Sequence, residues 1–258
     1  MPVMMTTPDP TVTRDQVLGG RLVLTQPARG HRVGHDALLL AAATPVGTRR
    51  LADFGAGVGA AGLAVLRRLP ETRGCLVEID PVLADLARRN VEDNGLAERC
   101  DVFTSDIERL ARPGGPEGFA NAFDLVLFNP PFNDVAAHQA SPHAGRARAH
   151  MAGAGLLERW IIAACRCLEP AGRLLMILRP QDIQALLTAL GGRFGAAELI
   201  PVHPAPHTCA VRLIVRARKG RRTAPALLSP LILAGADGRP TPEADAILRD
   251  GAGFPAQC

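Results

Sequence analysis

Aromatic residues are scarce in this chain, which has no Tyr, one Trp and eight Phe among 258 residues. Its core must therefore be packed from aliphatic side chains, and a Phe in a polar stretch is a candidate for a functional role. An apolar run long enough to cross a membrane is also lacking. Residues 1–13 show no basic start followed by an apolar stretch, as a secretory signal would. These absences predict a cytoplasmic protein with no membrane partner.

Clusters with the spacing of a metal site or a disulfide framework are absent as well. The six cysteines are scattered, and Cys165 and Cys167 lie two residues apart in a predicted helix, where they do not face each other. Reduced thiols, as in the cytosol, are the expected state. His138, His143 and His150 are not spaced like the ligands of a zinc site. The sequence therefore predicts no metal centre.

Strand and helix patterns alternate through the middle of the chain. Strands are expected at 51–54, 75–79, 102–104, 123–128, 174–178 and 211–215, the last of them antiparallel, and helices at 36–43, 60–69, from 81, 156–168 and 181–190. Asp36 and Asp80 are the predicted caps of two of these helices. This order is typical of a doubly wound α/β sheet with helices on both faces. We expect an extension at 1–47, the main domain at 48–222 and a Pro- and Gly-rich surface segment at 223–258.

A glycine loop follows the first strand of the main domain, with the sequence DFGAGVGAAG from Asp53 to Gly62. Glycines in a strand-to-helix turn let the backbone approach a ligand closely, and the helix terminus offers free N–H groups. Read from Gly57, the loop also matches the G-x-G-x-x-G pattern of dinucleotide-binding proteins, with Glu78 after the next strand. A dehydrogenase is therefore one alternative.

Two carboxylates favour S-adenosylmethionine over a dinucleotide. Asp53 precedes the first glycine, where it would repel a pyrophosphate but attract the ammonium and sulfonium groups of S-adenosylmethionine. Asp106 follows the third strand and is placed either to accept a hydrogen bond from the adenine or to cap a helix. Glu78 is suited to the ribose hydroxyls. The predicted cofactor-binding residues are Asp53, Gly55, Ala56, Gly57, Gly59, Glu78, Ile79, Asp106, Ile107 and Asn129.

The strongest motif is Asn129–Pro130–Pro131–Phe132, directly after the fourth strand. Carboxyl ends of parallel strands line the ligand crevice of such a sheet, so the motif is expected to face the glycine loop. An amine conjugated to a ring is a poor nucleophile, and hydrogen bonds to the Asn129 side-chain oxygen and the Pro130 carbonyl favour a pyramidal nitrogen. Phe132 offers a face on which a flipped base can stack. We predict that these four residues are catalytic, in an N-methyltransferase.

The motif resembles that of the class I methyltransferases with N-P-P-[FY], which include nucleic-acid adenine and guanine amino methylases and release-factor glutamine methylases. Two flanks, at 19–40 and 217–243, are similar to the bacterial tRNA1(Val) adenine-N6 methyltransferase family. This resemblance implies a Rossmann-like, mostly parallel seven-stranded sheet with a late antiparallel strand, S-adenosylmethionine as cofactor, and an adenine beside the tRNA anticodon as substrate. The family often has Tyr where this chain has Phe132, so stacking is kept and a phenolic hydrogen bond is lost.

A basic run near the end of the main domain completes the prediction. Arg218, Lys219, Arg221 and Arg222 are either solvated surface or RNA-binding residues beside the active-site face, and the net charge of +4 permits either role. RNA, specifically tRNA, is the expected partner. Alternatives are a guanine-N2 methyltransferase of ribosomal RNA, a glutamine methyltransferase of release factors, and an RNA-binding module without catalysis.

Overall fold

The computed structural model describes residues 11–29, 33–130 and 144–254, and for residues 144–154 it describes the backbone alone. Predicted features at Pro131, Phe132, His138, His143 and the side chain of His150 lie outside this part of the chain.

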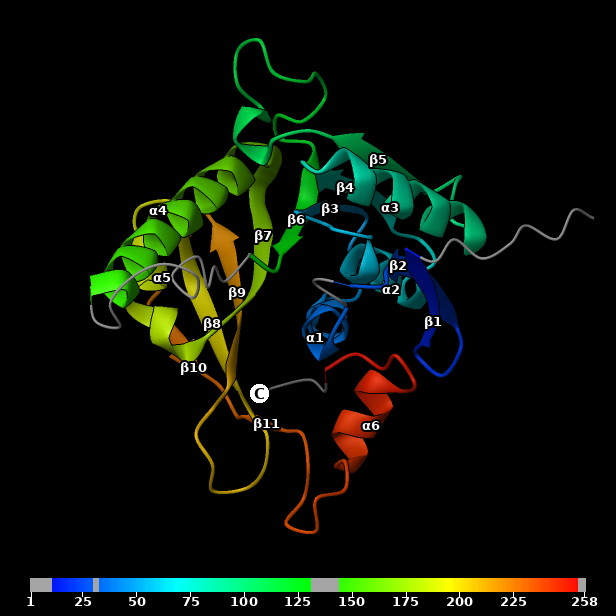
Figure 1. Cartoon of the computed structure of the whole chain (residues 1–258). Helices are drawn as coiled ribbons and strands as arrows, with labels where there is room; N and C mark the ends of the chain where they lie inside the picture. The colour runs from blue at the N-terminus through cyan, green and yellow to red at the C-terminus, as the bar shows by residue number, and fades with distance from the viewer. Residues whose placement is uncertain (1–10, 30–32, 131–143, 255–258) are drawn as a thin grey trace, which may run out of the picture.

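One twisted sheet organises the molecule (Figure 1). Its main strands are β3 (Arg50–Phe54), β4 (Arg73–Glu78), β5 (Cys100–Thr104), β6 (Phe123–Phe128), β7 (Leu168–Leu178), β8 (Phe194–His203) and β9 (Arg212–Lys219). They lie side by side in the order β5-β4-β3-β6-β7-β9-β8, and β9 is antiparallel to both of its neighbours. This confirms the predicted mostly parallel sheet with a late antiparallel strand. Two short strands, β10 (Ala226–Leu227) and β11 (Leu231–Ile232), pair with β8 and extend the sheet to nine strands.

Helices cover both faces of the sheet, as the βα alternation predicts. One face packs against α1 (His35–Ala43), α2 (Ala60–Arg68) and α3 (Pro81–Asp93), and the other against α4 (Ala144–Cys167) and α5 (Ile183–Leu190). Each strand contributes alternate side chains to the two cores. In β6, Leu125 and Leu127 belong to the first core and Val126 and Phe128 to the second. Burial on both faces explains why this strand is a continuous apolar run.

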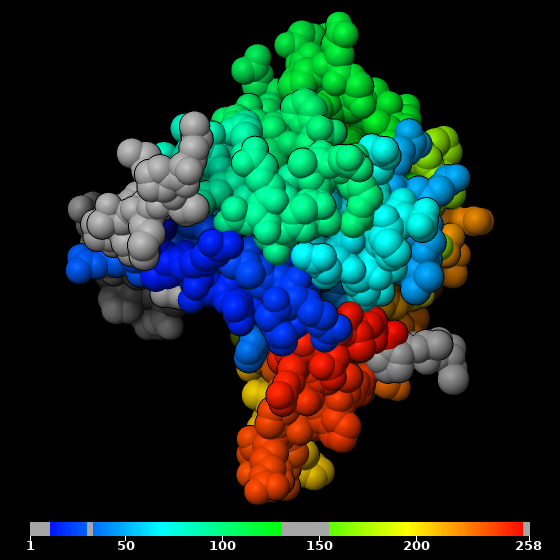
Figure 2. Space-filling view, turned by 90° about the vertical axis from the view of Figure 1, so that its right-hand side faces the viewer, coloured from blue at the N-terminus to red at the C-terminus, as the bar shows by residue number. Residues whose placement is uncertain are grey.

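An N-terminal hairpin lies beside α3, outside the main sheet. Its strands are β1 (Val12–Val17) and β2 (Leu22–Pro27), which form a separate antiparallel pair. Figure 2 shows this blue hairpin between the cyan and green region of β4, α3 and β5 and the red C-terminal segment. At that junction the Arg21 guanidinium donates to the Arg249 carbonyl over 3.1 Å. The C-terminal segment adds α6 (Pro242–Leu248), and the Phe254 N–H donates to the Ala42 carbonyl of α1.

Two helix starts test the predicted caps. Asp80 caps α3 as predicted, because its carboxylate accepts hydrogen bonds from the backbone N–H groups of Val82 and Leu83. The prediction for Asp36 is wrong. Gly34 occupies the N-cap position of α1 without any side-chain cap, and the Asp36 carboxylate instead accepts a 2.7 Å hydrogen bond from Arg212.

Some elements have other bounds than the sequence indicates. Helix α4 begins at Ala144, well before the predicted Leu156, and β7 begins at Leu168, before the predicted Leu174. Strand β8 and helix α6 were not predicted, whereas the short strands expected in the 1–47 extension are β1 and β2. In the part of the chain that the structure describes, no helix is both long and apolar enough to cross a membrane.

Candidate active site

The glycine loop joins β3 to α2 at the carboxyl edge of the sheet. Gly55, Gly57 and Gly59 have φ of 64°, 57° and 89°, a left-handed conformation that other residues adopt only under strain. A Cβ on Gly55 would lie 2.5 Å from the Trp160 ring, so this position has no room for a side chain. Around Gly57, by contrast, a Cβ would meet no described atom within 4 Å. The loop is therefore packed against the protein at Gly55 and open to a ligand at Gly57.

The first carboxylate of the site, Asp53, lies buried beneath this loop with 3% of its surface exposed. Its Oδ2 accepts a 2.8 Å hydrogen bond from the Gly62 N–H in the first turn of α2. Burial raises the pKa of Asp53 to about 7, the Gly62 N–H opposes this shift, and the nearby Glu78 carboxylate adds to it. Asp53 therefore holds α2 against β3, a structural role that the sequence did not indicate.

Glu78 is the second carboxylate, at the end of β4, and it accepts three backbone hydrogen bonds. Its Oε2 accepts from Gly57 over 2.8 Å, and its Oε1 accepts from Ile79 and Asp80 over 2.8 and 2.9 Å. These bonds fix the carboxylate against the open part of the glycine loop. Ile79 follows with 64% of its surface exposed, although it is a large apolar residue. A carboxylate beside an exposed apolar face is suited to a ribose and its base.

The third carboxylate, Asp106, follows β5 and caps a short 3-10 helix, η1 (Ile107–Arg109). Its Oδ1 accepts a 2.9 Å hydrogen bond from the Glu108 N–H. Capping was the alternative role weighed for this residue, and the adenine contact stays a prediction. The neighbouring Ile107 is 5% exposed and belongs to the core on the α4 side of the sheet, so its predicted cofactor contact stays untested too.

The catalytic motif begins where the expected geometry requires it. Phe128 at the end of β6 lies between Phe54 of β3 and Met176 of β7, so Asn129 and Pro130 leave the sheet beside the glycine loop. The Oδ1 of Asn129 is buried and accepts no hydrogen bond from any described residue. A buried acceptor without a donor is costly, so this oxygen is suited to a ligand N–H.

A buried amide in α3 supports the glycine loop from behind. Asn90 is fully buried, and its Nδ2 donates to the carbonyls of Val58 and Thr25, both over 2.9 Å. Its Oδ1 accepts a 2.7 Å hydrogen bond from the Thr25 N–H. One turn later, Asn94 exchanges a similar pair of bonds with Val23. The side chain of Asn90 thus joins β2 to the cofactor loop. We did not predict this role, although two Asn residues four apart on an amphipathic helix are a usable signal.

The basic run lies at the other edge of the sheet. Because β9 is antiparallel to β7, its end lies beside the beginning of β7, where Arg218 pairs with Arg173, and Lys219 pairs with Phe194 of β8. Lys219 donates to the carbonyl of Leu168 and to the Asn121 side chain, which lies just before β6. The expected position beside the active-site face is therefore wrong. Among the described residues, no group of three or more His, Cys, Asp or Glu side chains is arranged to hold a metal ion.

Comparison with known proteins gives the family. The model of the methyltransferase small domain matches residues 32–201, which include the glycine loop, Glu78 and Asn129. The chain belongs to the methyltransferase small domain family. This membership confirms the predicted methyltransferase activity and its cofactor, S-adenosylmethionine.

Individual relatives agree with this membership. The chain is 30% identical over 205 residues to the tRNA1(Val) (adenine(37)-N6)-methyltransferase of Porphyromonas gingivalis, covering 75% of this chain and 77% of the relative. It is 37% identical to the enzyme of the same name from Yersinia pestis over 103 residues, 39% of this chain and 40% of that one.

Solved structures show the same fold. A predicted O-methyltransferase from Agrobacterium tumefaciens superposes with a TM-score of 0.72 at 32% identity, covering 85% of this chain and 98% of the other. The 16S rRNA N2 G1207 methyltransferase of Thermus thermophilus superposes with a TM-score of 0.54 at 20% identity, over 81% and 50% of the two chains. At that identity the second match supports the fold alone.

Cofactor affinity in this methyltransferase is expected to depend on pH through Asp53. A carboxyl group with a pKa near 7 is mostly neutral at pH 6 and mostly charged at pH 8, and only the charged form attracts the ammonium group of the cofactor. Affinity should therefore fall about tenfold between pH 8 and pH 6. Calorimetric titration with S-adenosylhomocysteine at pH 6, 7 and 8 measures this. The Asp53→Asn variant should bind more weakly with little pH dependence, and an equal slope in both proteins would assign the titration to another group.

Proposed function

We propose that this chain transfers the methyl group of S-adenosylmethionine to the exocyclic N6 amino group of an adenine in tRNA, in the cytoplasm. The observation that supports this most is the buried Asn129 Oδ1 without a described donor, at the strand end beside the glycine loop. An amino group conjugated to a purine ring presents two N–H donors, and such an oxygen is suited to accept one of them. The curated relatives that cover most of the chain carry the same activity in their names.

Residues at the ends of β3 and β4 are suited to bind the cofactor, and residues after β6 are suited to orient the amino group that is methylated. Gly57 and Glu78 would hold the sugar and Asp53 the amino end of S-adenosylmethionine, which supplies an electrophilic methyl group when bound. Asn129 and the carbonyl of Pro130 would orient the amino group and draw electron density from its N–H bonds toward the nitrogen. The nitrogen lone pair is then available for the new C–N bond, the S–CH3 bond of the cofactor would break to leave S-adenosylhomocysteine, and the proton displaced from the amino group leaves to solvent.

The activity is tested on RNA isolated from a strain that lacks this protein. The purified chain and radiolabelled S-adenosylmethionine should place label in N6-methyladenosine of the tRNA fraction, identified by nucleoside mass spectrometry. Asn129→Ala protein serves as the control for label from a contaminating enzyme. Label in N2-methylguanosine of ribosomal RNA would mean that the substrate is ribosomal RNA. A parallel assay with purified release factors tests the other alternative: label there, with none in RNA, would mean that the acceptor is a protein glutamine.

A further inference from the structure

The amino edge of the sheet carries an unusual concentration of like charge. Arg173 of β7 lies directly opposite Arg218 of β9 in the antiparallel register. Like charges in this arrangement destabilise a sheet, by a few tenths of a kcal/mol up to about 1 kcal/mol. Lys219 is the next residue of β9, and Arg221 and Arg222 follow it in exposed positions. Arg166, exposed near the end of α4, approaches the same edge.

These cations have no carboxylate partners within the described residues. We call them the amino-edge cluster: Arg166, Arg173, Arg218, Lys219, Arg221 and Arg222. None of the six forms an ion pair with a described carboxylate, whereas Arg212 and Arg216 on the same strand, β9, pair with Asp36 and Glu198. Arginines earlier in β9 thus have carboxylate partners, whereas those at its end have none among the described residues. The lack of ion pairs is specific to this edge of the sheet.

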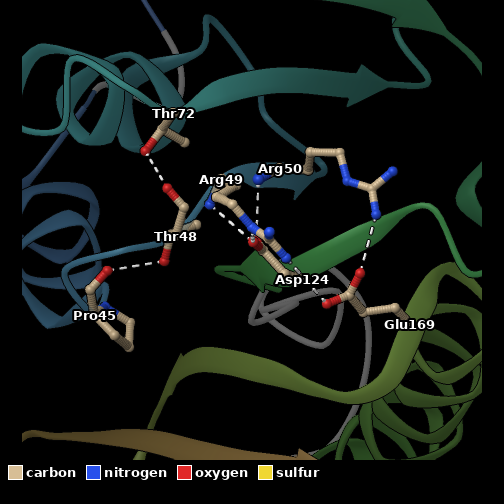
Figure 3. Close-up of polar contacts among 7 residues, drawn as sticks. All are labelled: Pro45, Thr48, Arg49, Arg50, Thr72, Asp124 and Glu169. Carbon is tan, nitrogen blue, oxygen red and sulfur yellow. Dashed lines mark hydrogen bonds and ion pairs between the residues drawn. The ribbon is translucent and has the colours of Figure 1, made fainter.

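Nearby carboxylates are already occupied, as Figure 3 shows. Asp124, at the start of β6, accepts hydrogen bonds from the backbone N–H groups of Arg49 and Arg50 over 2.8 and 3.1 Å. Glu169, at the start of β7, forms a 3.0 Å ion pair with Arg50 and a 3.9 Å pair with Arg49. These acidic residues clamp the beginnings of β3, β6 and β7 together, and they leave the amino-edge cluster uncompensated.

A hollow of about 480 Å³ borders the cluster at Arg166 and Lys219. Its lining includes Arg166, Arg193, Lys219, Asn121 and Cys165. The Lys219 ammonium is held there by hydrogen bonds to the Leu168 carbonyl over 2.5 Å and to the Asn121 side chain over 3.0 Å. Arg193 forms a 3.8 Å ion pair with Glu158 and donates a hydrogen bond to the Ala189 carbonyl over 3.3 Å. The cations that line the hollow and belong to the cluster are therefore Arg166 and Lys219, and an ammonium and a guanidinium group are both suited to a phosphate.

We propose that the amino-edge cluster binds RNA phosphates as a second contact of the tRNA, far from the methylated base. The inference rests on the proposed function. Along the six-residue strand β6, the cluster and Asn129 are separated by roughly 20 Å. One nucleotide cannot reach both places, so the second contact selects for a folded RNA that extends well beyond the target adenine. Contacts from guanidinium groups to backbone phosphates position an RNA without reading its sequence.

The test is the salt dependence of tRNA binding, measured by fluorescence anisotropy with full-length tRNA. The variant replaces Arg166, Arg218, Arg221 and Arg222 with Ala and keeps Lys219 and Arg173, which are partly buried. Each lost phosphate contact reduces the slope of log K against log salt by about 0.9 for a duplex. We expect the slope to fall by two or more and the affinity at 100 mM salt to fall at least about tenfold.

A matched control removes the same charge elsewhere. Arg14, Arg89, Arg239 and Arg249 are exposed and lie outside the amino-edge cluster. Their fourfold Ala variant should keep nearly the wild-type slope, and both variants should bind S-adenosylhomocysteine normally, which confirms folding.

Three results would overturn the inference. The first is an unchanged salt slope in the cluster variant, and the second is an equal decrease of that slope in the control variant. The third is a loss of polyglutamate binding by the cluster variant with tRNA binding intact, which would assign the cluster to an acidic protein. Failure of the proposed function is a separate result, since tRNA binding and its salt slope are measured without catalysis. If the cluster binds tRNA but the protein methylates another RNA, this inference holds and only the proposed substrate is wrong.

Discussion

Asn129→Ala is expected to lower the turnover of methyl transfer about a hundredfold or more while cofactor affinity stays within a few-fold of wild type. The replaced oxygen is buried at the end of β6 and accepts no hydrogen bond within the described protein. Its loss therefore breaks no described contact of the fold, and it removes one acceptor that would orient the amino group. The effect should appear in kcat, because this hydrogen bond strengthens as the nitrogen becomes pyramidal.

Single-turnover kinetics and calorimetry with S-adenosylhomocysteine separate the two quantities. Asn129→Asp is the matched control, because it keeps a side-chain oxygen at the same position while it replaces the amide donor with a second, charged oxygen acceptor. Its turnover should lie between those of wild type and the Ala variant. An Asp variant as slow as the Ala variant would show that an acceptor is not what this position supplies. A large loss of cofactor affinity in both would place Asn129 in the cofactor site instead.

The elements around the glycine loop could be predicted from sequence because their signals are local. Strand β6 is apolar on nearly every residue, and α3 begins at Pro81 behind an Asp that caps it. Both signals depend on the chemistry of neighbouring residues, and both elements begin where the sequence indicates. Strand β8 gave no such signal, since Gly195, two alanines and Pro201 interrupt its apolar pattern. It is stabilised by pairing with β9, a partner that local patterns do not reveal.

The position of the basic run shows how topology overrides sequence proximity. The strand ending in Lys219 was predicted to be antiparallel, and that direction carries its end to the amino edge of the sheet, away from Asn129. The predicted direction alone thus implies that the basic run lies at the amino edge. The four residues of the basic run were therefore expected at the carboxyl edge of the sheet, and they lie at its amino edge.

Hydrogen bonds to side chains were the least predictable part of the site. Asp53 was expected to act on the cofactor alone, and the structure adds a bond from its carboxylate to the first turn of α2. Asp36 was expected to cap its own helix, and it pairs with Arg212, far away in sequence. Which donor a carboxylate finds depends on how strands and helices are brought together, and this information is not local.

The second large effect is expected for Asn90→Ala, which should lower both stability and cofactor affinity. The change leaves the N–H and carbonyl of Thr25 and the carbonyl of Val58 buried without their partner. Unsatisfied buried groups cost about 1–3 kcal/mol each, so we expect a loss of roughly 3–5 kcal/mol in the free energy of unfolding. Urea unfolding followed by circular dichroism measures it.

Cofactor affinity distinguishes the role of Asn90 in the site from its role in the fold. Val58 lies between Gly57 and Gly59, so losing its hydrogen bond to Asn90 should loosen the loop and weaken S-adenosylhomocysteine binding about tenfold or more. Asn94→Ala is the matched control, because Asn94 holds β2 at Val23 in the same manner and forms no described bond to the glycine loop. It should destabilise the protein and spare cofactor affinity. If both variants lose affinity in proportion to stability, the hairpin contributes to the fold and Asn90 has no separate effect on the cofactor loop.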